Sequence, residues 1–124
     1  MSALDQIPES FKRVALKPNA FTFAWKRRTL EKLFEELLSS NIAIKSGEAW
    51  VVEGETLRAI PLKNGEIKLF EWNLERKKNE DWYDFVERST KQTLELIGGW
   101  DLEKNVRLDL INKIWYHFEF EEEE

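Results

Sequence analysis

The sequence predicts a single α+β domain, residues 1–124, in which an antiparallel sheet of four to five strands carries two packed helices. Three observations predict this fold class. Apolar residues recur at helical spacing in two segments, an Asn-Gly pair separates two strand-like segments, and apolar residues alternate along the C-terminal part. A chain of 124 residues with 42% hydrophobic residues is long enough to bury a substantial core. We expect residues 1–10 and 121–124 to fray.

The first third of the chain is predicted to contain a short strand followed by a helix. Residues Phe11 to Leu16 are the strand candidate, and Lys17-Pro18-Asn19 is a turn signal after it. The helix then extends to about Ser40, with Thr29 as its N-cap and Asn41 in the left-handed position that ends it. Its apolar stripe consists of Leu30, Leu33, Phe34, Leu37 and Leu38.

Three strand candidates follow that helix, at about residues 42–53, 56–63 and 66–74. Asn64-Gly65 predicts a hairpin between the last two, and Pro61 leaves its register open. In a tight two-residue hairpin, Pro61 would face Lys68 at a hydrogen-bonded pair and lose a ladder bond. A type I turn with a bulge at Gly65 would move Pro61 to a non-bonded pair. The tight register offers the more sensible side-chain pairs, Leu62 with Ile67, Ile60 with Leu69 and Arg58 with Glu71.

A second helix is predicted from about Trp82 to Gly98-Gly99, where the glycines would stop it. Its three faces differ in polarity. The core face comprises Trp82, Phe85, Val86, Ser89, Thr93, Leu96 and Ile97. The face in water comprises Asp84, Arg88, Lys91 and Glu95. A flanking stripe between them comprises Tyr83, Glu87, Thr90 and Leu94.

After Trp100 the apolar residues alternate with polar ones, which predicts one strand or two strands broken near Asn112-Lys113. A helix would scatter these residues around its circumference. The alternating residues are Val106, Leu108, Leu110, Ile114, Tyr116, Phe118 and Phe120.

Charge and composition limit the classes of partner. The net charge is −5, and it is uneven, because residues 1–30 are basic and the rest of the chain is acidic. An acidic body disfavours nucleic acid as a ligand and suits a basic protein partner. The triplet Lys26-Arg27-Arg28 is expected to be a solvated helix start. The chain has no Cys, no secretory signal at its start and no membrane-spanning apolar run, so we expect a cytoplasmic protein that does not bind a membrane.

The sequence offers little catalytic chemistry. His117 is the single histidine, and without Cys it cannot build a zinc site, so a structural or surface role is expected. Neither a phosphate-binding glycine motif nor a G-x-S-x-G motif occurs. We therefore expect no catalytic residues, no metal and no cofactor. With 24 acids in the chain, a carboxylate pair resembling an acid/base couple would arise by chance, and it is the remaining enzymatic alternative.

Aromatic residues near acids form the candidate binding surface. Trp50 and Trp82 are expected in the core, whereas Trp72, at a strand end before a charged loop, fits a core or a partner contact equally well. Tyrosine and tryptophan dominate protein interfaces, and an acidic rim would steer a basic partner towards them. The candidate partner-binding residues are Trp72, Glu80, Tyr83, Asp84 and Glu87.

Three segments also carry a family resemblance: Asn41 to Trp50, Gly65-Glu66-Ile67 leading to Trp72, and Asn79 to Ser89. Over about residues 42–97 the chain resembles the Immunity protein 40 family of bacterial polymorphic-toxin systems. The resemblance implies a protein that neutralises a co-encoded toxin domain by stoichiometric binding, and it supplies no catalytic residues. The acidic charge of the chain leads us to expect that this toxin domain has a basic surface. The segment after Trp100 looks like an addition to it. The alternative is a generic interaction or adaptor domain without a toxin partner.

Overall fold

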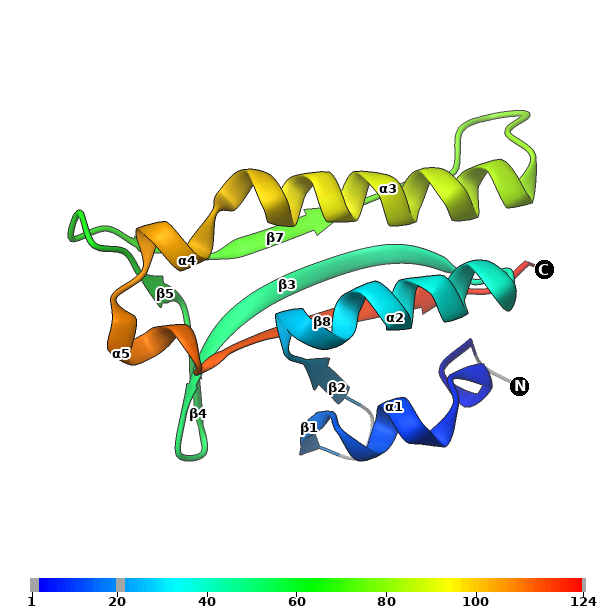
Figure 1. Ribbon diagram of the computed structural model, residues 1–124. Coiled ribbons are helices and arrows are strands. Elements are labelled where there is room, and N and C mark those ends of the chain that lie inside the picture. Colours follow the sequence, from blue (N-terminus) through cyan, green and yellow to red (C-terminus); the bar gives the residue numbers. More distant parts are fainter. Residues whose placement is uncertain (1–2, 20–21, 124) are drawn as a thin grey trace.

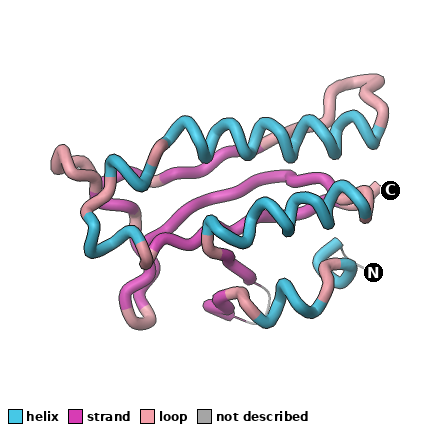
Figure 2. Tube along the Cα trace, viewed as in Figure 1, coloured by secondary structure: helices cyan, strands magenta, loops and turns pink. Residues whose placement is uncertain are grey.

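The computed structural model describes residues 3–19 and 22–123, and it confirms the α+β class, with helices packed on an antiparallel sheet (Figure 1). The helical elements are η1 (Ala3–Gln6), α1 (Glu9–Arg13), α2 (Arg27–Ser39), α3 (Trp82–Trp100), α4 (Leu102–Asn105) and α5 (Leu108–Ile111). The strands are β1 (Leu16–Asn19), β2 (Thr22–Trp25), β3 (Ala43–Glu53), β4 (Thr56–Arg58), β5 (Ile60–Pro61), β6 (Ile67–Lys68), β7 (Phe70–Asn73) and β8 (Ile114–Glu121). Figure 2 shows which parts of the chain are helix, strand and loop.

The described residues form a six-stranded sheet in the order β1-β2-β8-β3-β4, in which β7 also pairs with β3. β4 and β7 share one edge of β3, because β4 pairs with residues 51–53 and β7 pairs with residues 46–49. β8 lies between β2 and β3 and faces β3 from Ala43 to Val51. The C-terminal strand is therefore central to the sheet.

The N-terminal segment differs from the prediction. Phe11 belongs to the short helix α1 rather than to a strand, and the strand β1 instead includes the predicted turn at Pro18. A proline is tolerated there because β1 lies at the edge of the sheet. The sequence predicts fraying over residues 1–10, but Ala3 and Ile7 are buried in the main core. Residues 1, 2 and 124 lie outside the described residues.

α2 begins earlier than predicted, and its end is as expected. Lys26 is the N-cap and makes no side-chain cap bond, so the prediction of Thr29 as N-cap is wrong. Asn41 follows the helix with a φ of 59°, which confirms its left-handed position. The apolar stripe of α2 is buried at Leu30, Leu33, Phe34 and Leu37.

The hairpin adopts the bulged register. Pro61 faces Ile67, and the amide of Leu62 donates to the carbonyl of Glu66 (2.7 Å), so Pro61 occupies a pair that needs no ladder bond from it. Gly65 closes the turn with a φ of 93°. The pairing ends after β5 and β6, because β4 and β7 pair with β3 instead.

α3 and the segment after it correct three predictions. Gly98-Gly99 lie inside α3, which ends at Asp101 with a φ of 46°. Residues 102–111 form α4 and α5 rather than a strand, and Leu108 is 81% exposed. Val106 is extended between α4 and α5 and pairs with Leu62 in an isolated bridge, so the alternating residues Val106, Leu108 and Leu110 do not share one strand.

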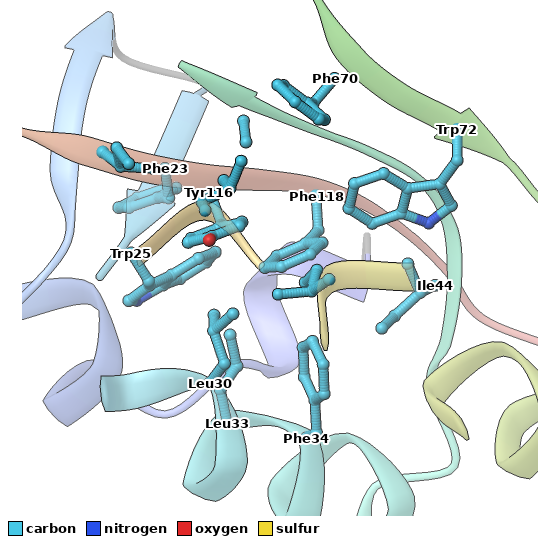
Figure 3. Close-up of a cluster of buried hydrophobic side chains, with 14 of the residues drawn as sticks. Phe23, Trp25, Leu30, Leu33, Phe34, Ile44, Phe70, Trp72, Tyr116 and Phe118 are labelled. Atoms are coloured by element: carbon cyan, nitrogen blue, oxygen red, sulfur yellow. The ribbon is translucent and has the colours of Figure 1, made fainter. Parts of the chain in front are cut away.

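The main core fills the space between α2, α3 and the sheet (Figure 3). Phe118 is at its centre, with its ring centroid 5.3 Å from that of Phe34 and 5.9 Å from that of Trp72. A second cluster under the start of α3 contains Ala43, Trp82, Phe85 and Val86. Within the described residues, no helix combines the length and apolar character needed to span a membrane.

Candidate functional site

Trp72, one of the five candidate binding residues, is part of the core. Its side chain is 8% exposed, and its indole N–H donates to the hydroxyl of Thr93 on α3 (3.2 Å). Figure 3 shows the indole pointing towards Phe118. The aromatic face of Trp72 is thus not available to a partner, and we correct its assignment to a structural role.

Glu80 is used to hold the loop before α3. Its carboxylate accepts two hydrogen bonds from the guanidinium of Arg88, one from Nε and one from an Nη atom, each at 2.8 Å. It also accepts from the amide of Lys77 (2.9 Å). The Arg88 hydrogen bonds, followed by the Lys77 bond, lower the pKa of Glu80 to about 2. Arg88 also donates to the carbonyl of Glu75, so this pair fixes the loop, and Glu80 is not a free surface charge.

The segments 41–50, 65–72 and 79–89 contact one another. The indole N–H of Trp82 donates to the carbonyl of Asn41 (2.9 Å), and the hydroxyl of Ser89 accepts from the amide of Ile44 (3.0 Å). Gly47 lies directly against the ring of Trp72, where a Cβ would overlap the indole. These residues therefore form the joint between α3, β3 and β7.

Tyr83, Asp84 and Glu87 remain on the surface of α3. Tyr83 is 47% exposed, and Asp84 and Glu87 are exposed beside it. Asp81 caps this helix by accepting from the amide of Tyr83 (3.0 Å), which fixes the position of the first turn. Three of the five candidate residues thus share one accessible surface, and Trp72 and Glu80 support the elements that carry it.

The flanking stripe of α3 borders a groove between α3 and α2. The groove has a volume of about 320 Å³, and its lining includes Leu38 of α2 together with Glu87, Thr90 and Leu94 of α3. Leu94 is 39% exposed. The prediction that this stripe is intermediate between core and water is wrong, because Tyr83, Glu87 and Leu94 are exposed and Thr90 is buried. We call Tyr83, Asp84, Glu87 and Leu94 the α3 flank.

A second acidic surface lies on the face of the sheet opposite the helices. Glu48 faces Glu71 across the β3–β7 pair and faces His117 across the β3–β8 pair, and Glu119 lies in the next row. A hollow of about 110 Å³ separates these side chains, which is smaller than a usual small-molecule site. The sequence shows the alternation, but only the register brings these acids together, so sequence reasoning missed this surface.

His117 has a structural environment. Its Nδ1 lies 2.9 Å from the carbonyl oxygen of Phe23, and its ring stacks on Trp50 with centroids 5.5 Å apart. The expected core position of Trp50 is confirmed. Within the described ranges, no group of three or more acidic, histidine or cysteine side chains could hold a metal ion.

Comparisons of the chain with protein-family models, with curated proteins and with solved structures gave no match.

Proposed function

We propose that this chain is an immunity protein that binds a cognate bacterial toxin domain and neutralises it by stoichiometric inhibition. The proposal rests on the resemblance of residues 42–97 and on the α3 flank. Binding rather than catalysis is the mode of action, so the inhibitor needs an accessible surface and a rigid scaffold behind it.

The observation that carries the proposal is the pairing of exposed apolar and acidic side chains on the α3 flank. Tyr83 and Leu94 are large apolar side chains that are at least 39% exposed, and they lie on one stripe of the helix. Asp84 and Glu87 are exposed next to them, and within the described residues neither forms an ion pair. A rigid aromatic residue with an acidic rim is the pattern expected for recognition of a basic protein surface.

The scaffold behind the α3 flank supports pre-organised binding. The Glu80–Arg88 pair fixes the loop before α3, and Trp82 and Ser89 bond the helix to the residues around the start of β3. A surface that is already ordered loses less conformational entropy when it binds. A complex of the usual size would bury about 1,600 Å², so the interface would extend from the α3 flank over the groove towards α2.

The direct test is co-expression with the product of the gene immediately upstream. We expect rescue of growth, and co-purification of the two proteins in a one-to-one complex. The variant Tyr83→Ala should weaken the complex by about 2 kcal/mol or more if Tyr83 is a central contact. Leu108→Ala is the matched control, since it removes an exposed apolar side chain from α5. Absence of both rescue and co-purification would remove the toxin partner from the proposal.

The alternative, a generic adaptor domain, uses the same surface with a different partner. It predicts a complex that depends on Tyr83 without any toxicity from the bound protein. Variants on the two surfaces show which one binds the partner. If the partner binds the acidic sheet face rather than the α3 flank, Glu48→Lys will weaken the complex and Tyr83→Ala will not.

A further inference from the structure

A hollow of about 350 Å³ lies where α2 begins, on different elements from the α3 flank. Its lining comes from α2, α4 and α5 and from the first residues of β8, and includes Lys26, Arg27, Arg28 and Tyr116. Figure 1 shows the start of α2 beside β8. The volume is within the usual range of small-molecule sites, roughly 300–1,000 Å³.

The three consecutive cations lack acidic partners. Within the described part of the chain none of them forms an ion pair, and the one carboxylate in the lining is that of Glu103, which is exposed. The ammonium of Lys26 lies 4.6 Å from the ring centroid of Trp115, a contact that leaves its positive charge in place. Partial burial, followed by the nearby charge of Arg28, lowers the pKa of Lys26.

Backbone donors add to this positive charge. Lys26 provides no side-chain cap, and the amide of Thr29 donates to the carbonyl of Lys26. The amides of Arg27 and Arg28 precede the first intrahelical bond, so the helix offers them no acceptor. The positive end of the helix dipole lies at the same point, which makes three cations there unfavourable without an anion.

Tyr116 adds a buried phenol to the lining of the hollow. Its side chain is only 3% exposed, yet it lines the hollow and interacts with the guanidinium of Arg27. A guanidinium can only donate, so this contact does not use the phenolic proton. Burial raises the pKa of Tyr116, so the phenol keeps its proton as a donor into the hollow.

We propose that this hollow binds the phosphate group of a small phosphate monoester. Its lining holds three cations and one carboxylate, a balance of about +2, and a phosphate monoester carries a charge of about −1.5 to −2 at neutral pH. Two guanidinium groups, a phenol and two helix amides are all donors, which suits an anion with three terminal oxygens. The remaining volume would contain the esterified part.

The test is a titration of the full chain with inorganic phosphate and with glycerol phosphate at pH 7.5 and constant ionic strength. We expect saturable changes in the NMR signals of the Arg27 and Arg28 amides and of the Trp115 indole. The ester should bind more tightly than inorganic phosphate. Binding should weaken as the pH falls to 5.5, because the second pKa of phosphate is about 6.

Variants separate a built site from general attraction to positive charge. Arg28→Gln should weaken binding about tenfold, which corresponds to the loss of one charged hydrogen-bonding group, and Arg28→Lys should weaken it less. Tyr116→Phe should weaken it about three- to tenfold without any change in charge. Arg13→Gln, which removes an exposed cation from α1, is the matched control and should have less than about a twofold effect.

Four results would overturn the assignment. Signals that shift without saturation, or an Arg13→Gln effect equal to that of Arg28→Gln, would show only charge screening. Acetate binding as tightly as phosphate would exclude a phosphate site. Equal affinity for inorganic phosphate and glycerol phosphate would exclude the ester. Thermal melting of each variant shows that it is folded, so a loss of binding is attributable to the site.

Discussion

Individual residues in this protein are constrained by close packing around Trp72. Gly47 is needed because the indole of Trp72 occupies the space of its missing Cβ, and this contact sets the distance between β3 and the ring. The bulge between Ile44 and Ser46 lies just before it on the same strand. A glycine in a strand usually weakens it, so its presence here reflects the close approach of a large side chain.

Gly47→Ala should destabilise the protein by about 1–3 kcal/mol, the usual cost of forcing an extra group into a packed core. Gly98→Ala is the matched control. Gly98 lies in α3 with open space where its Cβ would be, so the alanine should stabilise the helix by about 0.5–1 kcal/mol. Chemical denaturation measures the free energy of unfolding of both variants. A Gly47→Ala variant that is as stable as the wild type, or one that changes stability as Gly98→Ala does, would contradict the packing argument.

Glu80 gives the protein a defined dependence of stability on pH. Its pKa in the folded state is about 2, below its ordinary value of 4.5, mainly because of its hydrogen bonds to Arg88. A carboxylate with a lowered folded-state pKa stabilises the fold above the ordinary pKa, and this contribution is lost as the pH falls through the folded pKa. The relevant window is therefore from pH 4.5 down to about pH 2.

Glu80→Gln should make the fall of the melting temperature across that window shallower than in the wild type. Glu87→Gln, which removes an exposed acid from α3, should keep the wild-type fall. Melting curves at several pH values measure the slopes. A Glu80→Gln slope equal to that of the wild type would mean that the Arg88 pair does not contribute to folding stability.

At the scale of elements, α3 is held to β3 by a side-chain hydrogen bond as well as by packing. The amide of Ile44 donates to the hydroxyl of Ser89, which itself donates to the carbonyl of Val86 (3.0 Å). Ser89 is fully buried, so water cannot replace it. The hydrogen bond from Ile44 to Ser89 therefore links the irregular part of β3 to α3.

Ser89→Ala should cost about 1–3 kcal/mol, because it leaves a buried amide without an acceptor. Hydrogen exchange of the Ile44 amide should accelerate more than that of Val51, which lies further along β3. Ser39→Ala at the exposed end of α2 is the control, with an expected change within about 0.5 kcal/mol. Unchanged exchange at Ile44 would show that another group satisfies its amide.

The sequence predicts the long elements well, because their periodicity extends over many residues. The buried stripe of α2, the strand β3 and the even-numbered core residues of β8 are confirmed. Predictions of short elements and of helix ends are wrong where one local sequence signal is compatible with two structures. Gly98-Gly99 suit a helix end, but they have open space around them and are tolerated within α3.

The candidate site was predicted only in part for a related reason. Helical periodicity identifies Tyr83, Asp84 and Glu87 as surface residues correctly. Periodicity gives no information about Glu80, because Glu80 lies in the loop before α3 and the path of that loop places it beside Arg88. Burial of Trp72 depends on the pairing of β7 with β3, which follows from tertiary register rather than from the residues around Trp72.

At the scale of the whole molecule, the basic and acidic parts of the chain occupy different surfaces. The basic triplet lines the hollow at the start of α2, whereas acids surround Tyr83 on α3 and line the exposed face of β3, β7 and β8. Because the charges are separated, the hollow at the start of α2 can attract an anion while the α3 flank attracts a basic protein. This separation also explains why a net charge of −5 says little about either surface.

Binding through the α3 flank is tested by the association rate of the chain with the upstream gene product at low and at high salt. Charge reversal of the α3 flank, Asp84→Lys with Glu87→Lys, should slow association more at low salt than at high salt. Glu55→Lys with Glu66→Lys makes the same change of charge at two exposed loop positions and should slow it much less. Equal slowing by the two double variants, or no dependence on salt, would contradict binding through the α3 flank.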